Sequence, residues 1–509
     1  MAKLFIPFGS LNLDGALHTH ASRLNDFSLI EGMDDVIPGP QDTTLPRRSL
    51  SVVTTPALGA KALGCISIRT GEGADLVFAG TSAALYKATS TVTATFTFSD
   101  VSIAGGYSTG TGEVWEFVEW QGTNDGGAVV KQSLIATNFT NDVQRIFHTP
   151  GSGSTTVTFS ALIGSPAVPP KARHIGVIGQ FLVLGNTQTI SASTNFTPAR
   201  VWWSAFGAPG DFTPSATTQA DYEDLTTGGA VQKVVGGNEY GYIFQQKQVQ
   251  VMRYVGGTTI FDFAPINFAE GTPIPNSVVP YDGAVYYISD QGFHALSGVE
   301  AKNIGNNVVD RYFWRTVEQT RFYEVTATFD PVNKLIIWAF PTDTAGYCKK
   351  ALAYHIPTGR WARWTEDIEL LATIRQGEPS VKVIAFNTAH KLCTFTSDAA
   401  VAATITTKAI QPVPGRRWQC NGARILADMG YTGATLTGNI SVKWSDSPLP
   451  ATSPSASTSV SLNPDNYINL RTAGRFQQFT VSLTAPNAGA DGTMKYTGME
   501  LDYEVLGER

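Results

Sequence analysis

One pattern recurs along most of this 509-residue chain: two runs of β-branched and aromatic residues flank a short polar turn. Small and polar residues at each turn permit a tight reversal, and the flanking runs have the composition of strands. The sequence therefore predicts seven β-hairpins, at residues 75–87, 134–147, 181–191, 240–254, 284–296, 334–355 and 381–395.

The spacing of these hairpins predicts how they assemble. Their equivalent positions follow one another at steps of 44 residues (Ile243 to Tyr287) to 59 residues (Leu184 to Ile243). The seven positions are Phe78, Ala136, Leu184, Ile243, Tyr287, Trp338 and Ile384. Repeats of this length, each with a central hairpin, are typical of propeller blades of about four strands. The alternative is a stack of unrelated β-sandwich hairpins.

The amino-acid composition agrees with an all-β fold in which few sheet edges are left unpaired. Only 15 % of residues are charged, against a usual share of about 25 %, and 49 Gly and 27 Pro supply turn formers. A weakly charged β-chain needs protected sheet edges, and closing a ring provides them. We therefore predict an irregular β-propeller of about seven blades, within a range of about six to eight.

Two regions lie outside the repeat. Residues 1–60 are punctuated by Pro and Gly and predict an extended N-terminal arm laid over another surface, and residues 61–410 predict the propeller. Apolar residues at helical spacing predict a short helical insertion near 306–322. After a Pro-rich boundary, residues 411–509 return to short alternating segments, which predict a separate β-sandwich.

The charge balance argues against one class of function, and the N-terminal segment and the cysteines indicate the cellular compartment. With 36 basic and 42 acidic residues the net charge is -6, which argues against gripping nucleic acid by bulk charge. The first segment lacks the continuous apolar stretch of a signal peptide, and no window resembles a membrane span. Four scattered cysteines, Cys65, Cys348, Cys393 and Cys420, predict reduced thiols in a protein made in the cytoplasm.

The chain carries no recognisable catalytic or cofactor-binding motif. His18 and His20 could supply two metal ligands, but a two-histidine set is incomplete. The turn Ser289 to Phe293 departs from the repeated aspartate turn of sialidase-like propellers. We expect no catalytic residue, no metal and no cofactor, while carboxylates from separate blades could still meet as a glycosidase pair.

Three regions together resemble the tail hub, or nozzle, proteins of short-tailed bacteriophages, also called packaged-DNA stabilisation proteins. The first is residues 200–212, the second runs from 233 through 305, and the third covers 471–475 and 498–502. The likeness covers most of residues 170–509. It lies in the pattern of residue types, and no invariant catalytic motif is part of it. The matching residues are Trp202, Trp203, Ser204, Asp211, Phe212, Gly236, Gly237, Gly256, Gly257, Gly292, Gly298, Gly305, Arg471, Gly474 and Arg475.

The resemblance implies a structural protein of the virion tail that is assembled in the host cytoplasm. Family members form homohexamers below the portal and adaptor rings, extend the channel for double-stranded DNA, and offer attachment sites for tail fibres or spikes. The resemblance implies non-specific passage of the DNA and no membrane insertion by this chain. A channel poor in Lys and Arg would let DNA slide, since few counterions would be released.

Two further hypotheses concern loops and an alternative function. Tyr107 and Thr109, in the loop at 105–112, and Pro450 and Pro454, in the loop at 448–461, are candidate interface or channel residues. Both loops could equally be plain connectors. The alternative function is a β-propeller tail adhesin, either glycan-binding or a glycoside hydrolase, because the aromatic side chains could stack on sugars.

Overall fold

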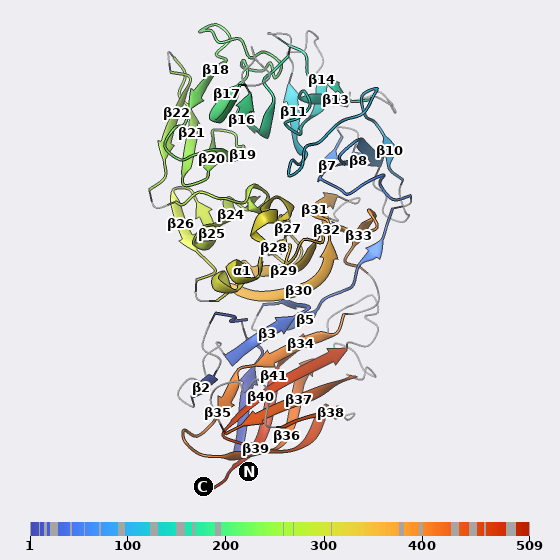
Figure 1. Ribbon diagram of the computed structural model, residues 1–509, viewed down its shortest axis with the longest axis vertical. Helices are drawn as coiled ribbons and strands as arrows, with labels where there is room; N and C mark the ends of the chain where they lie inside the picture. The colour runs from blue at the N-terminus through green and yellow to red at the C-terminus, as the bar shows by residue number, and fades with distance from the viewer. Residues whose placement is uncertain are drawn as a thin grey trace.

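The seven predicted hairpins form the centres of seven antiparallel blades of four strands each, arranged around a ring (Figure 1). Six blades are separate sheets, and the four strands of the other blade belong to a larger, 11-stranded sheet. All seven equivalent positions lie on the second strand of their sheet, and all are fully buried. These strands carry long apolar runs because they are paired on both edges and covered on both faces. The predicted all-β propeller is confirmed, and the described residues form seven blades.

The computed structural model describes most of the chain. The described residues are 2–9, 11–14, 18–20, 29–40, 43–54, 56–70, 73–89, 97–122, 131–148, 158–164, 168–188, 195–257, 259–267, 269–306, 308–375, 381–396, 401–428, 437–446, 456–462, 465–484 and 495–507. Among their helices, none has the length and apolar character needed to cross a bilayer.

Each blade runs from an inner strand, which is nearest the centre of the ring, to an outer strand at the rim (Figure 1). Blades 1 and 2 comprise β7 (Gly64–Arg69), β8 (Asp75–Gly80), β9 (Leu85–Thr89), β10 (Ser99–Asp100), and β11 (Glu116–Gly122), β12 (Lys131–Thr137), β13 (Gln144–His148), β14 (Ser160–Ala161). Blades 3 and 4 comprise β15 (Ala172–Ile178), β16 (Phe181–Gln188), β17 (Phe196–Trp203), β18 (Asp221–Asp224), and β19 (Val231–Val235), β20 (Tyr240–Gln245), β21 (Val249–Tyr254), β22 (Phe261–Pro265).

The remaining blades complete the ring. Blades 5 and 6 comprise β23 (Val279–Tyr281), β24 (Ala284–Ser289), β25 (Gly292–Ser297), β26 (Glu300–Asn303), and β27 (Thr326–Asp330), β28 (Leu335–Phe340), β29 (Cys348–His355), β30 (Arg360–Ile368). Blade 7 contains β31 (Leu370–Arg375), β32 (Val381–Phe386) and β33 (Leu392–Thr394), and its fourth strand is β6 (Ser51–Val52) from the N-terminal region. The ring is thus closed by a strand from near the start of the chain.

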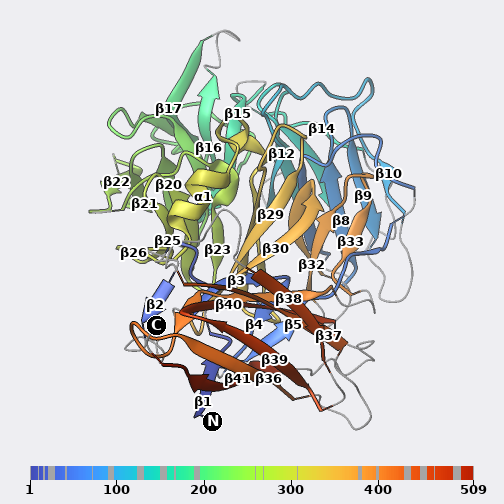
Figure 2. The same cartoon turned by 60° about the horizontal axis from the view of Figure 1, so that its bottom comes forward.

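The second domain is a β-sandwich built from both ends of the chain (Figure 2). One sheet has the order β39-β36-β41-β5-β4, with β1 also paired to β41, and the other contains β2, β35, β40, β34, β3, β37 and β38. The N-terminal strands are β1 (Ala2–Pro7), β2 (His18–His20), β3 (Ile30–Asp34), β4 (Val36–Pro38) and β5 (Thr44–Pro46). The C-terminal strands are β34 (Ala403–Thr407), β35 (Ala409–Gln411), β36 (Trp418–Asp428), β37 (Thr437–Ser445), β38 (Ala456–Ser461), β39 (Tyr467–Gly474), β40 (Phe476–Thr484) and β41 (Lys495–Val505).

These positions differ from the predicted division of the chain. Residues 1–60 do not form an arm laid over a surface, because five of their strands belong to the sandwich and β6 belongs to blade 7. The strands β34 and β35 begin before residue 411, where the sandwich was predicted to start, but pair within the sandwich. The difference has a physical cause: the N-terminal strands are short, three of them contain Pro, and most pair with strands hundreds of residues away rather than following a local periodicity.

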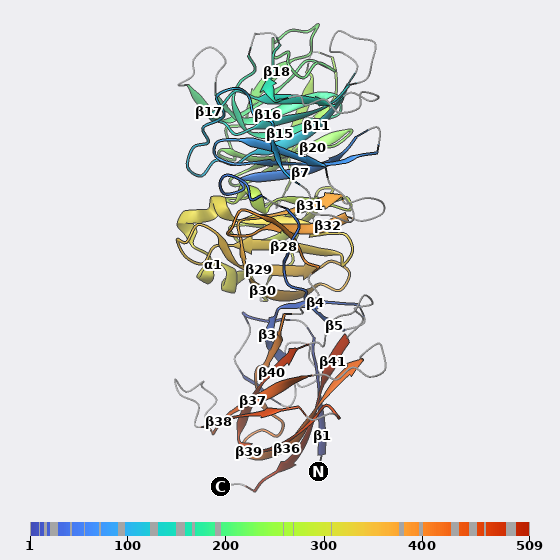
Figure 3. The ribbon, with the colours of Figure 1, turned by 90° about the vertical axis from the view of Figure 1, so that its right-hand side faces the viewer.

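A single sheet connects the two domains. The outer strand of blade 6, β30, pairs in parallel with β3 at Arg363 and Asp34, and β3 pairs in turn with β34 of the sandwich. The propeller and the sandwich therefore lie end to end, and both termini are at the end far from the propeller (Figure 3). Shared backbone pairing fixes the two domains more firmly than a flexible linker would.

Arg360, at the start of β30, holds the N-terminal segment to blade 6. Its guanidinium is buried and donates to the carbonyl oxygens of Phe8 (2.7 Å), Gly9 (2.7 Å) and Thr43 (2.7 Å), and to Thr44 Oγ1 (3.0 Å). Arginine suits this place because its five donors keep a fixed planar arrangement. One side chain thus satisfies backbone acceptors from two separate stretches of the N-terminal segment.

Two further arginines form ion pairs across the same contact. Arg47, only 1 % exposed, pairs with Asp35 (2.8 Å) and with Glu366 on β30 (3.0 Å). Arg363 pairs with Asp34, its partner in the parallel register, and its Nη2 lies 2.7 Å from Asp34 Oδ2. The charges at the joint therefore neutralise one another, around an Arg47 side chain that is almost completely buried and acidic partners that are partly buried.

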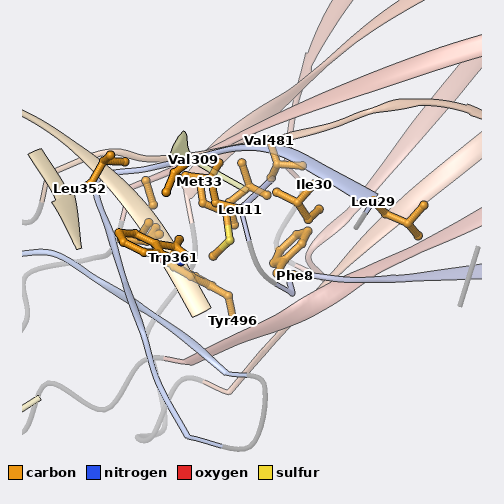
Figure 4. Packing of buried hydrophobic residues seen from close by; sticks show 14 of the residues in the cluster. Phe8, Leu11, Leu29, Ile30, Met33, Val309, Leu352, Trp361, Val481 and Tyr496 are labelled. Atoms are coloured by element: carbon orange, nitrogen blue, oxygen red, sulfur yellow. The ribbon is translucent and has the colours of Figure 1, made fainter. Parts of the chain in front are cut away.

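The apolar core is continuous through this joint. One cluster contains Trp361 and Leu352 of blade 6 and Met33 of the N-terminal segment, together with Val481 and Tyr496 of the sandwich (Figure 4). Burial of such side chains is the main favourable term in folding, and here the buried cluster continues from one domain into the other without a break. Both domains therefore share one core at their junction.

A short helix lies between blades 5 and 6, within the range predicted as a helical insertion. This helix, α1 (Asp310–Thr316), follows the 3₁₀ turn η3 (Pro275–Ser277) in the chain and precedes η4 (Gln319–Glu324). Phe313 is buried, with its ring edge-to-face against Phe293 (5.2 Å) and Phe340 (5.1 Å). The helix ends earlier than predicted because the backbone of Val317 is extended.

We expect Arg47→Met to lower the free energy of unfolding by about 3–5 kcal/mol, because Asp35 and Glu366 would lose the cation that neutralises them. Urea denaturation followed by tryptophan fluorescence measures this change. Arg253→Met is the matched control, since Arg253 is exposed, and its effect should stay within about 0.5 kcal/mol. Equal unfolding midpoints for the two variants would contradict the role given to Arg47.

Candidate functional site: the propeller channel

The inner strands of the blades enclose a central cavity of about 690 Å³. Segments that immediately precede or form the inner strand of every blade contribute to its wall, from Gly64 in blade 1 to Leu371 in blade 7. A cavity of this size is within the range of small-molecule sites, about 300–1,000 Å³. The channel is therefore the first place to look for chemistry.

A buried ion cluster on blades 2, 3 and 4 occupies one side of the channel. Glu116 accepts from Lys233 Nζ (2.7 Å) and lies 2.9 Å from His174 Nδ1, and its second oxygen accepts from the Ile175 backbone N–H (3.2 Å). Burial alone would raise the pKa of Glu116, but Lys233 and His174 outweigh burial and lower this pKa to about 2. Glu116 is therefore ionised at neutral pH and links three blades.

The other channel carboxylates are also paired. Glu324 accepts from Lys61 Nζ (2.9 Å) and from Arg321 Nη2 (2.6 Å), and these bonds lower its pKa against the raising effect of burial. Glu369 lies 2.8 Å from His390 Nδ1. A glycosidase general acid needs a raised pKa. Glu116 and Glu324 are instead both shifted in the opposite direction.

The described part of the chain has no evident metal-binding site. Within it, no group of three or more His, Cys, Asp or Glu side chains could hold a metal ion. The strand β2, which carries His18 and His20, pairs in parallel with β35. The side chains of these two histidines lie outside the described residues.

The two residues predicted on the loop at 105–112 occupy different environments. Thr109 lines the cavity inside the propeller, which is not the DNA channel of the prediction, and its Oγ1 accepts from Asn138 Nδ2 (3.1 Å). Tyr107 is buried, with its ring edge-to-face against Trp115, and its hydroxyl donates to Gln144 Oε1 (3.2 Å). Pro450 and Pro454 lie outside the described residues.

The first group of family-pattern residues packs within blade 3. Trp203 Nε1 donates to the Gln219 carbonyl (2.8 Å), and Ser204 Oγ accepts from the Leu182 N–H (3.0 Å). Four of the five residues of this group are buried, and the fifth, Asp211, is half-buried in the turn that follows. The group is Trp202, Trp203, Ser204, Asp211 and Phe212. These residues therefore stabilise a blade rather than face the channel.

Two family-pattern glycines surround a buried carboxylate. A Cβ at Gly292 or at Gly305 would lie 2.1 Å from the Asp310 carboxylate, so only glycine fits at either position. Asp310 accepts from the Phe293 N–H (3.0 Å), and burial raises its pKa. The three residues thus join blade 5 to α1. The other glycines of blades 4 and 5 lie in connections between strands: Gly236, Gly237, Gly256, Gly257 and Gly298.

The last three family-pattern residues belong to the sandwich. Arg471 is exposed on β39, Gly474 is buried at the end of that strand, and the Arg475 carbonyl accepts from Trp418 Nε1 (3.1 Å). The structure therefore does not bring the fifteen residues together at one site. They are distributed over blades 3 to 5 and the sandwich.

The charged residues of the channel were not singled out by the sequence analysis. Lys233 is the one charge in the mostly apolar inner strand β19, whereas β11 carries two, Glu116 and Glu119. A lone charge in a buried strand is a usable signal, because such a group must find a partner. The identity of that partner depends on ring closure, which the local sequence does not specify.

Comparisons with known proteins give no family assignment: no family model matches the chain, and no curated protein matches it. A solved structure of BBS1N in complex with ARL6DN has a TM-score of 0.38 and 9 % identity, over 69 % of this chain and 97 % of that chain. The Pan2 WD40 domain of Neurospora crassa has a TM-score of 0.38 and 9 % identity, over 69 % and 98 %.

An exo-β-1,3-galactanase from Phanerochaete chrysosporium, solved with galactose, has a TM-score of 0.27 and 11 % identity, over 90 % of this chain and 100 % of that chain. At these TM-scores and identities, none of the three structures supports an inference about what this chain binds or does. No enzymatic activity is established by them. The assignment of the fold rests on the strand pairing itself.

We expect the channel to lose stability in acid through Glu116. Its pKa of about 2 lies below the ordinary value of 4.5, so the ionised form stabilises the fold above about pH 4.5, and this is lost as pH falls through about 2. At about 1.4 kcal/mol per tenfold change in proton affinity, the contribution is roughly 3 kcal/mol.

Urea unfolding at a series of pH values measures this contribution. Glu116→Gln should be less stable than the unmodified chain at pH 7, and the difference should shrink towards pH 2. Glu300→Gln, at an exposed position on β26, serves as the control and should show no such convergence. A difference that stays constant with pH would be incompatible with an ionised Glu116.

Proposed function

We propose that this protein is a non-catalytic structural component of the tail of a short-tailed bacteriophage, where copies of it form a nozzle ring. The observation that carries the proposal is the sheet that runs without interruption from blade 6 through β3 into the sandwich. A tail component must transmit force between the capsid and the host surface without bending. The proposal also uses the sequence resemblance over residues 170–509.

The joint between the domains supports a mechanical role. Arg360, Arg47 and Arg363 bind the N-terminal segment to β30 through buried or half-buried hydrogen bonds and ion pairs. Interfaces between domains of one chain are more often small and polar, and they permit relative motion. Here a shared sheet and a shared apolar core oppose such motion.

The size of the channel determines where DNA would pass. A cavity of about 690 Å³ is too small for a double helix. The major groove alone is about 12 Å wide, and the whole helix is wider still. In this proposal DNA passes between copies, through the centre of the ring, and not through the propeller. The weak net charge of -6 suits such a path, because strong counterion release would hold the DNA.

The pairing of the channel carboxylates favours the structural role over the glycosidase alternative. Glu116, Glu324 and Glu369 each contact a cationic or imidazole partner. Such groups stabilise the ring, whereas acid–base catalysis needs a carboxyl that remains protonated near neutral pH. The partners implied are further copies of this chain, portal and adaptor rings, tail fibres or spikes, and passing DNA.

The proposed assembly is tested on purified protein and on particles. We expect mass photometry of the full chain to show monomers or hexamers, and a reconstruction of the phage particle to place a ring of copies below the portal, coaxial with the tail. Trimers in solution, as in adhesive fibres, or a density map without this chain in the tail channel, would refute the nozzle assignment.

A further inference from the structure

A second cavity, of about 300 Å³, opens beside the channel and is referred to here as the mouth pocket. Gly112, Glu113 and Val114 line both cavities and separate them. The side chains that line the mouth pocket come mainly from blades 3 and 4 and from the residues around η3 and η4. Those that matter below are Arg173, Asn186, Phe196, Gln232, Gln246 and Tyr323.

Two irregularities in strand pairing meet at the mouth pocket. In blade 4, the register of β19 and β20 shifts between Val231 and Lys233, which leaves Gln232 as an extra residue. In blade 3, the register of β16 and β17 shifts between Gly185 and Thr187, beside Asn186. Such bulges redirect side chains and occur frequently next to binding and active sites. Two of them on neighbouring blades place Gln232 and Asn186 at one cavity.

The backbone of blade 3 is strained at the same place. Asn186 has a φ of 56°, in the left-handed region that residues other than glycine rarely occupy. It is buried, its Nδ2 donates to the Val231 carbonyl (2.9 Å), and its Oδ1 accepts from Arg173 Nη1 (3.1 Å). Strain that is held by such contacts is found most often at functional sites. Asn186 is therefore a positioning residue of the mouth pocket.

The charges of the mouth pocket are neutralised. Arg173 makes a two-pronged ion pair with Glu113, from Nη2 (2.8 Å) and Nε (3.0 Å). Its guanidinium also lies over the rings of Phe139 (4.0 Å) and Phe196 (4.8 Å). His174, which also lines the pocket, is paired with Glu116, so the charged lining residues that the structure describes all have partners. The wall nevertheless keeps Phe196, an aromatic ring that is 44 % exposed.

The mouth pocket also offers hydrogen-bonding groups that the protein does not use. Within the described residues, the side-chain amides of Gln232 and Gln246 and the hydroxyl of Tyr323 make no hydrogen bond. Each amide can donate and accept at once, as can the hydroxyl. A cavity that combines neutral donor–acceptor groups with an exposed ring suits a ligand that has many hydroxyls and an apolar face.

We propose that the mouth pocket binds a neutral saccharide of one or two sugar units. Gln232, Gln246 and Tyr323 would hydrogen-bond the hydroxyls, and Phe196 would pack against the C–H face of the ring. The size agrees, since about 300 Å³ is the lower limit for small-molecule sites. This site is independent of the nozzle assignment and requires no hydrolysis.

Saturation-transfer NMR on the full chain tests the proposal, with glucose, galactose, N-acetylglucosamine and rhamnose as probes at tens of millimolar and N-acetylneuraminic acid as the charged comparison. We expect at least one neutral sugar to bind and the charged sugar to bind more weakly. Gln232→Ala and Tyr323→Phe should each weaken binding by about five- to tenfold, the effect of one lost hydrogen bond. Phe196→Ala should abolish the signal.

Gln291→Ala is the matched control, because Gln291 is an exposed glutamine in the turn between β24 and β25. It should leave binding unchanged, and circular dichroism should show that all variants are folded. Three results would overturn the proposal: no signal with any neutral sugar, binding of the charged sugar alone, or binding that the three pocket variants do not change. Each is independent of whether the protein forms a tail ring.

Discussion

The contact between the N-terminal segment and the outer strand of blade 6 is the interaction on which the rest of the architecture depends. At nine residues, β30 is far longer than the other outer strands, which have two to five. Such a long open edge would be a site for aggregation, and β3 covers part of it. The same N-terminal segment also supplies β6 to close the ring and β1 to the sandwich, so one stretch of chain completes three separate structures.

The propeller was predictable because its signal is local. The second strand of each blade is paired on both edges and covered by neighbouring blades, so Phe78 and Trp338, which are 260 residues apart, occupy the same fully buried environment. This gives an apolar run and a turn that repeat along the sequence. The role of residues 1–60 was not predictable in this way. The strand β1 pairs with β41, which lies at the other end of the chain. The strands β1, β4 and β5 end in Pro7, Pro38 and Pro46, and such short strands are locally indistinguishable from loops.

The candidate sites show the same division between local and long-range information. No motif marks Glu116, Lys233 and His174, because each lies on a different blade and they meet only when the ring closes. Gln232 has no sequence signature either, since its place in a bulge depends on the register of β19 with β20. The family-pattern glycines are different. Gly292 and Gly305 are required by the Asp310 carboxylate, a contact within about twenty residues of sequence that a pattern can record.

The joint at β30 and the mouth pocket lie apart, since the pocket is beside the central cavity and is lined mainly by blades 3 and 4. Blade 3 lies at one end of the long axis, and the sandwich lies at the other, beyond β30 (Figure 1). A ligand held at the mouth pocket would therefore contact blades whose inner strands Glu116 connects through its ion pairs with His174 and Lys233. Buried ion pairs contribute little net stability compared with apolar packing, but they favour one fixed arrangement of their partners. Fixed geometry is what a rigid two-domain body requires if binding in the propeller is to act on the sandwich.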